Sequence, residues 1–277
     1  PYYMDTYGFH GIHGRALAIA SGTKIARPDL SVWVVTGDGD NMSIGGNHFI
    51  HACRRNVDLN VLMFNNEVYS LTKGQFSPTS RVGQVTKSSP YGVIDEPFDP
   101  VTLALGAGAK FVARGFDKSR NDLQELMKLS HQHKGFSFVE IYTNCIIFND
   151  GAFNDFSLKE NQPDHTVHLK NGEPLIFGKE QDKGIKLDGL KPVVVDLKEF
   201  SKDDLLIYDT KDANLAFIVA RMSENESLPR PVGVFLDIDE EPYEQRVIRQ
   251  IEEEQEKKGE GSLEELLTGD DYWEIKE

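Results

Sequence analysis

The stretch LSVWVVTGDGD, residues 30–40, joins an apolar run to a polar, glycine-containing end. Its first part, LSVWVV, is a short, mainly apolar run rich in β-branched side chains, which is typical of a strand buried on both faces of a sheet. Residues 59–64, LNVLMF, repeat the pattern. Helix-forming segments lie at 15–26 and 43–54, and Ser43 is the expected N-cap of the second. Strands that alternate with helices predict a parallel sheet with helices on both faces.

The remainder of residues 1–150 continues this alternation. After a long polar stretch at 67–100, the predicted elements are an apolar turn at 103–107, a strand at 110–113, a helix at 122–133 and a strand at 136–142. Polar stretches of that length are uncommon within a compact domain and are usually functional. We therefore predict a doubly wound parallel α/β domain over residues 1–150.

Residues 151–277 carry all of the net charge. The chain has 45 acidic and 30 basic residues and a formal net charge of −15. Residues 1–150 hold 14 of each kind, whereas residues 151–277 hold 31 acidic and 16 basic residues. Within this part, short structured pieces are predicted at 192–197, 215–221 and 231–236, a charged helix at 241–258, and terminal docking points at 263–267 and 272–275. We expect an acidic α+β C-terminal extension.

The composition excludes several classes of protein. The negative net charge argues against binding nucleic acid or an anionic membrane, because phosphate contacts need clustered Lys and Arg. No apolar run approaches the roughly 18–20 residues that span a bilayer. With only Cys53 and Cys145, a disulfide framework is not expected, which favours a reducing, cytoplasmic compartment. The chain opens at Pro1 without a leader-like start, so we expect a preceding segment to be missing.

Polar residues follow the two buried strands at their carboxyl ends. Asp38 lies between Gly37 and Gly39 after the first strand, and Asn66 follows the second. In open α/β sheets ligands bind outside these ends, and carboxylate and amide oxygens suit Mg²⁺. The helix expected from Ser43 would offer its N–H groups to a phosphate. A Gly-Asp-Gly turn alone is more often a plain turn with a solvated aspartate. Because Asn66 also stands at the end of a buried strand, we instead predict that Asp38 and Asn66 form half of a site that binds a diphosphate and Mg²⁺.

Two other glycine-rich sites are excluded by spacing. A dinucleotide fingerprint needs a third glycine where Met42 stands, and no segment matches a Walker-type phosphate loop.

The motifs along residues 1–150 resemble those of a known family. They are His13-Gly14-Arg15-Ala16, Gly37-Asp38-Gly39-Asp40, Asn65-Asn66-Glu67-Val68-Tyr69, Leu71-Thr72-Lys73-Gly74-Gln75 and Ser77-Pro78-Thr79-Ser80. Together they resemble the β subunit of the 2-oxoacid:ferredoxin oxidoreductases, which bind thiamine diphosphate. The 2-oxoglutarate branch is the closest fit, and the resemblance is weaker through the acidic remainder.

The resemblance implies the cofactor site. It implies that Asp38 and Asn66 bind Mg²⁺ through their side chains and Val68 through its backbone carbonyl. The residues implied to line the thiamine diphosphate are Gly37, Gly39, Asp40, Ser70 and Leu71. The family commonly has glycine at the position of Ser70, so a backbone contact there requires serine to adopt the same φ and ψ.

The resemblance also implies two residues of the substrate pocket. Lys73 matches a lysine associated with substrate choice, and its cation could pair with the second carboxylate of 2-oxoglutarate. A flexible surface lysine is the alternative. His13 matches a motif near the thiamine and is expected to line the pocket, whereas His10, His48 and His51 are expected to pack or to form hydrogen bonds.

Cys145 corresponds to the fourth thiolate of a 4Fe-4S cluster in the resembled family. The family's other three thiolates come from its N-terminal region, and none of them is present here. A cluster that takes four thiolates cannot be held by one. Either the cluster region lies upstream of Pro1, which we favour, or the cluster is lost. Cys53, beside two arginines in a predicted helix, is expected to be structural.

The implied reaction is the oxidative decarboxylation of a 2-oxoacid with CoA to acyl-CoA, CO₂ and reduced ferredoxin. In the family, the glutamate that activates the cofactor belongs to the α subunit, so Glu67 is not assigned that role and the chain is expected to be half an active site. A noncatalytic α/β scaffold subunit and a non-oxidative thiamine-diphosphate decarboxylase are the alternatives. Because ferredoxins are commonly acidic, we expect the acidic extension to pack on the partner subunit or to solubilise the assembly.

Overall fold

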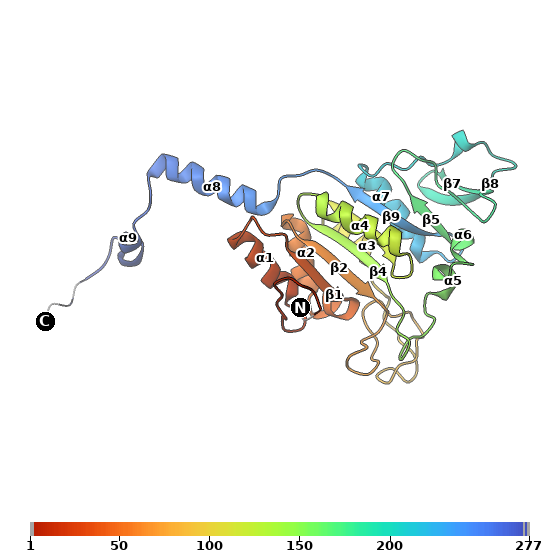
Figure 1. Cartoon of the computed structure of the whole chain (residues 1–277), viewed down its shortest axis with the longest axis horizontal. Helices are drawn as coiled ribbons and strands as arrows, with labels where there is room; N and C mark the ends of the chain where they lie inside the picture. The colour runs from red at the N-terminus through yellow and green to blue at the C-terminus, as the bar shows by residue number, and fades with distance from the viewer. Residues whose placement is uncertain (1–2, 274, 276–277) are drawn as a thin grey trace.

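The computed structural model describes residues 3–273 and residue 275. A six-stranded sheet with the order β1-β2-β4-β3-β9-β5 forms its centre (Figure 1). The strands of the N-terminal part are β1 (Trp33–Gly37), β2 (Asn60–Asn65), β3 (Phe111–Phe116) and β4 (Ser137–Tyr142). These four are mutually parallel, as the buried apolar runs predicted.

Helices cover both faces of the sheet. On one face lie α1 (Ala16–Ala26), α2 (Gly46–Arg55), α3 (Pro100–Gly106) and α7 (Ala213–Ala220), whose apolar side chains share the larger hydrophobic core. Phe49 of α2 is wholly buried there against the rings of Phe136 and Phe138. On the other face α4 (Arg120–Gln132) packs Leu126 into a second core cluster. The doubly wound α/β fold predicted from the sequence is confirmed.

Two strands of the C-terminal part extend this sheet. β9 (Arg230–Asp237) pairs antiparallel with β3, and β5 (Thr166–Leu169) pairs parallel with β9. The predicted division at residue 150 stays a prediction, but the two parts share one sheet. The remaining elements are the short helices α5 (Asn154–Ser157) and α6 (Gln162–His165) and a separate antiparallel sheet of β6 (Ile176–Phe177), β7 (Lys183–Asp188) and β8 (Lys191–Asp196).

The start of α2 differs from the prediction. A turn of π-helix, Asp40–Ile44, follows β1, and α2 begins at Gly46 with Gly45 as its N-cap. The expected N-cap role of Ser43 is therefore wrong. A side chain at position 45 would place its Cβ 2.6 Å from the carbonyl oxygen of Asp40, so the tight approach of the two turns requires glycine.

The chain ends in an arm that projects from the body (Figure 1). The arm consists of α8 (Tyr243–Lys258) and α9 (Leu263–Thr268). Its base is anchored, because Asp58 N–H donates to Glu244 Oε2 at 3.3 Å and Tyr243 N–H donates to the Asn56 carbonyl at 3.1 Å. Farther out, the leucines of α9 and the side chains of residues 272, 273 and 275 are exposed. The predicted docking points therefore do not pack on the described part of this chain.

In the part of the chain that the structure describes, no helix is long and apolar enough to cross a bilayer.

Deletion of residues 259–277 is expected to leave the stability of the body unchanged, because the side chains of α9 are exposed. The thermal midpoint should shift by less than about 2 °C in differential scanning fluorimetry. Glu244→Ala removes a buried acceptor at the base of the arm and should lower the midpoint. A larger loss from the deletion than from Glu244→Ala would contradict this placement of the arm.

Candidate functional site at the carboxyl ends of β1 and β2

The carboxyl ends of β1 and β2 lie side by side, because the two strands are parallel neighbours that pair Gly37 with Phe64. Asp38 follows the first strand directly and Asn66 follows the second. The sheet therefore brings them together, and the N–H of Asn66 donates to Asp38 Oδ1 at 3.5 Å. The structure thus joins the two residues that the spacing singled out.

Asp38 is a buried carboxylate surrounded by hydroxyl groups. Its Oδ2 accepts from Ser77 Oγ at 2.5 Å and from Thr79 Oγ1 at 2.8 Å. Burial raises the pKa of Asp38, and these hydroxyls and the N–H of Asn66 act in the opposite direction. Among the described residues no cationic side chain contacts Asp38. A buried carboxylate without a cationic partner is suited to hold a metal ion.

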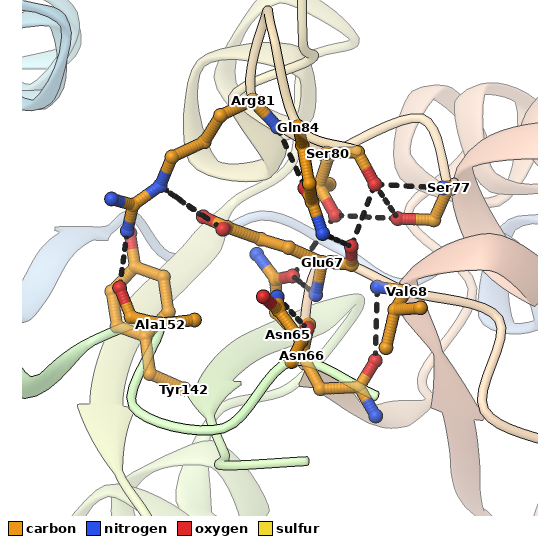
Figure 2. Close-up of polar contacts among 12 residues, drawn as sticks. Asn65, Asn66, Glu67, Val68, Ser77, Ser80, Arg81, Gln84, Tyr142 and Ala152 are labelled. Carbon is orange, nitrogen blue, oxygen red and sulfur yellow. Dashed lines mark hydrogen bonds and ion pairs between the residues drawn. The ribbon is translucent and has the colours of Figure 1, made fainter. Parts of the chain in front are cut away.

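Asn66 lies in a local turn that presents its side chain beside Asp38. Its Oδ1 accepts from Val68 N at 3.2 Å (Figure 2). Its Nδ2 donates to Ser70 Oγ at 3.0 Å. An amide oxygen has two lone pairs, so Asn66 Oδ1 keeps one for a further ligand. The backbone carbonyl of Asn66 accepts from Asn149 Nδ2 at 2.9 Å, which fixes the turn. Asp38 and Asn66 suit Mg²⁺ by their chemistry, because a carboxylate oxygen and an amide oxygen are both hard ligands and lie together at the carboxyl ends of the strands.

Gly39 and Asp40 are held by contacts within the chain. The hydroxyl of Tyr69 donates to the Gly39 carbonyl at 2.7 Å. Asp40 accepts from Gly14 N at 2.6 Å and pairs with His13 Nδ1 at 2.5 Å. Asp40 thus ties the His13 motif to the end of β1, and His13 lies beside the Tyr69 ring at 5.8 Å between centroids.

Lys73 stands at the tip of a small hairpin. The hairpin closes through Tyr69 N–H to the Gln75 carbonyl at 2.9 Å, and Lys73 has a left-handed φ of 74°. The side chains of Lys73 and Leu71 are exposed, the latter at 97%. The hairpin therefore presents Lys73 outward from this chain. Ser70, at the base of the hairpin, contacts Asn66 through its hydroxyl group.

Cys145 lies beside Ser70, with Sγ 3.3 Å from Ser70 Oγ. Partial burial raises the pKa of this thiol, but hydrogen bonds from Ser70 and from the backbone N–H groups of residues 147–149 lower it more, so the net direction is down. Such an environment favours a thiolate. Cys53 is fully buried and its pKa is raised by burial, which fits the structural role expected of it. Within residues 3–273 and 275 no three His, Cys, Asp or Glu side chains group as a metal centre.

Comparison with known proteins agrees with this geometry. Residues 1–141 match the family described as thiamine pyrophosphate enzyme, C-terminal TPP binding domain. The 2-oxoglutarate oxidoreductase subunit KorB of Mycobacterium tuberculosis is 45% identical over 99% of this chain and 74% of its own length. The 2-oxoglutarate synthase subunit KorB of Archaeoglobus fulgidus is 50% identical over 52% of this chain and 54% of its own length.

A solved structure agrees as well. The 2-oxoglutarate:ferredoxin oxidoreductase of Magnetococcus marinus, with 2-oxoglutarate, coenzyme A and succinyl-CoA bound, superimposes with a TM-score of 0.74. The alignment has 30% identity and covers 96% of this chain and 76% of that one.

The chain belongs to the β subunits of the 2-oxoacid:ferredoxin oxidoreductases. The family expected from the sequence motifs is therefore confirmed, and with it an oxidoreductase function and a domain of the thiamine-diphosphate-binding type.

Glu67 fixes the loop that follows β2, next to Asn66 (Figure 2). It has a left-handed φ of 56°, its carbonyl accepts from Ser80 Oγ at 2.6 Å, and its carboxylate pairs with Arg81 at 3.1 Å. Burial raises the pKa of Glu67 to about 7, with Arg81 acting in the opposite direction. Arg81 also donates to the Ala152 carbonyl at 2.6 Å. These contacts hold the loop after β2 against the segment that follows β4.

Several residues of the site were not identified from the sequence. The motif Ser77-Pro78-Thr79-Ser80 does not by itself indicate that Ser77 and Thr79 bind Asp38. Nor do the motifs indicate that Tyr69 donates to the Gly39 carbonyl, or that Asn65 donates to Glu140. The available signal was that Ser77-Pro78-Thr79-Ser80 places hydroxyls two residues apart in a loop after the second motif, but nothing local indicates that the loop returns to Asp38.

Gly39→Ala and Gly37→Ala form a matched pair that tests the packing of Tyr69. A Cβ at position 39 would lie 2.3 Å from Tyr69 Cε1, whereas one at position 37 meets no atom closer than 4.0 Å. We expect Gly39→Ala to lower the free energy of unfolding by about 1–3 kcal/mol and Gly37→Ala to change it by no more than about 0.5 kcal/mol. Equal effects in urea denaturation would be inconsistent with this packing.

Proposed function

We propose that this chain holds thiamine diphosphate and Mg²⁺ at the strand ends described above, and that the assembled enzyme oxidises 2-oxoglutarate. One observation carries the proposal: Asp38 is buried next to Asn66 in a chain of this family, and no cationic side chain among the described residues contacts it. The relatives named for 2-oxoglutarate and the neighbour with that substrate bound support the choice of 2-oxoacid. CoA and ferredoxin are the proposed co-substrate and electron acceptor.

Within the proposed site, each residue has a task. Asp38, Asn66 and the carbonyl of Val68 would hold Mg²⁺, which would neutralise charge on the diphosphate. The diphosphate and thiamine lie against Gly37, Gly39, Asp40, Ser70 and Leu71, with His13 at the pocket wall. When bound, thiamine diphosphate supplies the electron sink for decarboxylation of a 2-oxoacid. Ser77 and Thr79 hold the Asp38 carboxylate through Oδ2, so that Oδ1 would be the oxygen available to the cation.

Cys145 is the proposed cluster ligand. Its lowered pKa and its N–H and hydroxyl neighbours suit a metal thiolate, and it can supply one of the four that a 4Fe-4S cluster takes. Its contact with Ser70 places the thiolate next to the proposed Mg²⁺ site. The non-oxidative alternative would have no use for this thiolate.

The surface around the site supports a partner subunit. Large apolar side chains lie fully or largely exposed on the N-terminal segment and on the loops after β2: Tyr3, Tyr7, Phe9, Ile12, Leu71, Tyr91 and Ile94. Large apolar side chains left exposed are typical of protein interfaces. We propose that the α subunit covers them and completes the active site, and that Lys73 on its exposed hairpin points into the shared pocket to bind the distal carboxylate of 2-oxoglutarate.

Asp38→Ala is expected to abolish cofactor retention and activity, because it removes the charged metal ligand. Purified α/β complex should reduce a viologen dye with 2-oxoglutarate and CoA, and the variant complex should not. Bound thiamine diphosphate, measured after desalting, should fall below a tenth of the wild-type content, a loss of at least about tenfold. The control is Asp29→Ala, on an exposed carboxylate. Full activity in Asp38→Ala would refute the site and leave the noncatalytic scaffold.

Lys73→Ala is expected to raise the KM for 2-oxoglutarate by roughly 10–100-fold, because it removes a hydrogen bond between two charged groups. The KM for pyruvate, which lacks the second carboxylate, should stay within about twofold. Lys118→Ala, on another exposed lysine, is the control. Parallel increases for both substrates would instead assign Lys73 a role in folding of the hairpin or in subunit contact.

A further inference from the structure

Asn65, the first residue of the Asn-Asn pair, is buried and uses both ends of its side-chain amide. Its Oδ1 accepts from Glu67 N at 3.2 Å and lies 3.0 Å from Thr79 Oγ1, whose single proton is shared between this oxygen and Asp38 Oδ2. Its Nδ2 donates to Glu140 Oε1 at 2.7 Å. The backbone N–H of Glu67 can only donate, so the amide oxygen must face it and the NH₂ must face Glu140.

Glu140 is fixed by a buried arginine. Arg114 and Glu140 are opposite neighbours in the register of β3 and β4, and both side chains are fully buried. Arg114 Nε donates to Glu140 Oε2 at 2.5 Å, and its other nitrogens donate to Asp99 Oδ2 and Ser223 Oγ, each at 2.6 Å. Each oxygen of Glu140 therefore accepts one hydrogen bond, one from Arg114 and one from Asn65. A donor group in place of either Glu140 oxygen would face another donor, and that hydrogen bond would be lost.

From Asn65 the contacts lead directly to the proposed metal ligands. Thr79, which touches Asn65 Oδ1, also contacts Asp38 Oδ2 at 2.8 Å. Glu67, whose N–H is held by the same oxygen, lies in the chain between Asn66 and Val68. The polarity of the Asn65 amide thus sets the position of Thr79 against Asp38 and the course of the backbone that carries the other two ligands.

We propose that Glu140 is a positioning residue of the thiamine-diphosphate site, acting by fixing the orientation of the Asn65 amide. This inference rests on the proposed function of the site. Arg114 holds Glu140, Glu140 orients Asn65, and Asn65 places Thr79 and the turn from Asn66 to Val68 for binding Mg²⁺ and diphosphate. A buried ion pair that only contributed to folding would, when altered, lower the stability of the protein without changing the affinity of the folded protein for the cofactor.

Glu140→Gln tests this polarity at constant shape. A glutamine has one acceptor and one donor end, while Glu140 meets two donors. With its oxygen facing Arg114, its NH₂ meets Asn65 Nδ2, and Asn65 must turn over and present NH₂ to Thr79 and to the N–H of Glu67. We expect the dissociation constant for thiamine diphosphate at saturating Mg²⁺ to rise roughly 10–100-fold, as for other partners that orient metal ligands.

Asn65→Asp added to Glu140→Gln should restore binding. In the double variant one oxygen of the new aspartate accepts from the NH₂ of the new glutamine, the other accepts from Thr79 and the N–H of Glu67, and the buried charge is conserved. Asn65→Asp alone places two carboxylates together and should weaken binding at least about tenfold. The dissociation constant of the double variant should return to within about threefold of wild type.

Isothermal titration of thiamine diphosphate into the cofactor-free α/β complex with Mg²⁺ measures these constants, and differential scanning fluorimetry without cofactor measures stability. The control is Asn60→Asp, at the other end of the same strand, where a buried asparagine accepts from Ser130 Oγ at 3.0 Å. It should lower the thermal midpoint and leave the dissociation constant within about twofold.

The outcomes separate the inference from the proposed function. Failure of the wild-type complex to bind thiamine diphosphate would refute the proposed site. Wild-type binding with Glu140→Gln within about twofold of it, or a double variant no tighter than its single variants, would overturn the positioning role. If Glu140→Gln does not fold, Thr79→Val decides, because it keeps the shape and removes the hydroxyl between Asn65 and Asp38. An unchanged constant in that variant would also overturn the inference.

Discussion

The burial of the Asp38 carboxylate is the constraint on which the rest of the site depends. Removing a carboxylate from water is costly unless hydrogen bonds or a cation replace the lost hydration. Here Ser77 and Thr79 supply two hydroxyls to one oxygen, and they reach it from a loop that begins beyond the next strand. The long segment after β2 must therefore fold back over the strand ends. Among the described residues, the other oxygen has one long contact, with the N–H of Asn66, which leaves it available to the proposed cation.

The buried pair of Arg114 and Glu140 adds a second charged group to the interior. Such pairs contribute little net stability, although losing one partner costs about 3–5 kcal/mol. Arg114 lies between the rings of Tyr142 and Phe235, at 5.5 and 5.4 Å from their centroids, and is held in place by its neighbours. A rigid pair at the centre of the sheet can fix a neighbouring amide. Its position next to Asn65 thus connects the packing of the core with the geometry of the strand ends.

The sequence predicts those features of the fold and the site that depend on neighbouring residues in the chain. Buried runs predicted β1 and β2, and position after a strand selected Asp38 and Asn66, because parallel neighbours align their carboxyl ends. The return of Thr79 to Asp38 could not be predicted, since no periodicity reports where a long loop closes. Residues 231–236 are expected only as a short structured piece. They form part of β9, which joins the sheet antiparallel to β3 without a crossover helix, so the alternation of strands and helices does not predict this pairing. Ser43 does not cap α2, because it lies within a turn of π-helix that precedes the helix.

The outward face of the site explains why the chain needs a partner. Asp38 and the hydroxyls around it are buried by this chain alone, whereas Leu71 at the tip of the hairpin is 97% exposed and Lys73 is exposed beside it. A pocket for a small acid must exclude water on all sides, and an exposed hairpin cannot do so. The proposed metal-binding end of the site is thus organised within this chain, whereas the proposed substrate end has to be enclosed by a partner subunit. Under the proposed function, cofactor binding and substrate choice depend on different parts of the molecule, so substitutions at Glu140 and at Lys73 should affect them separately.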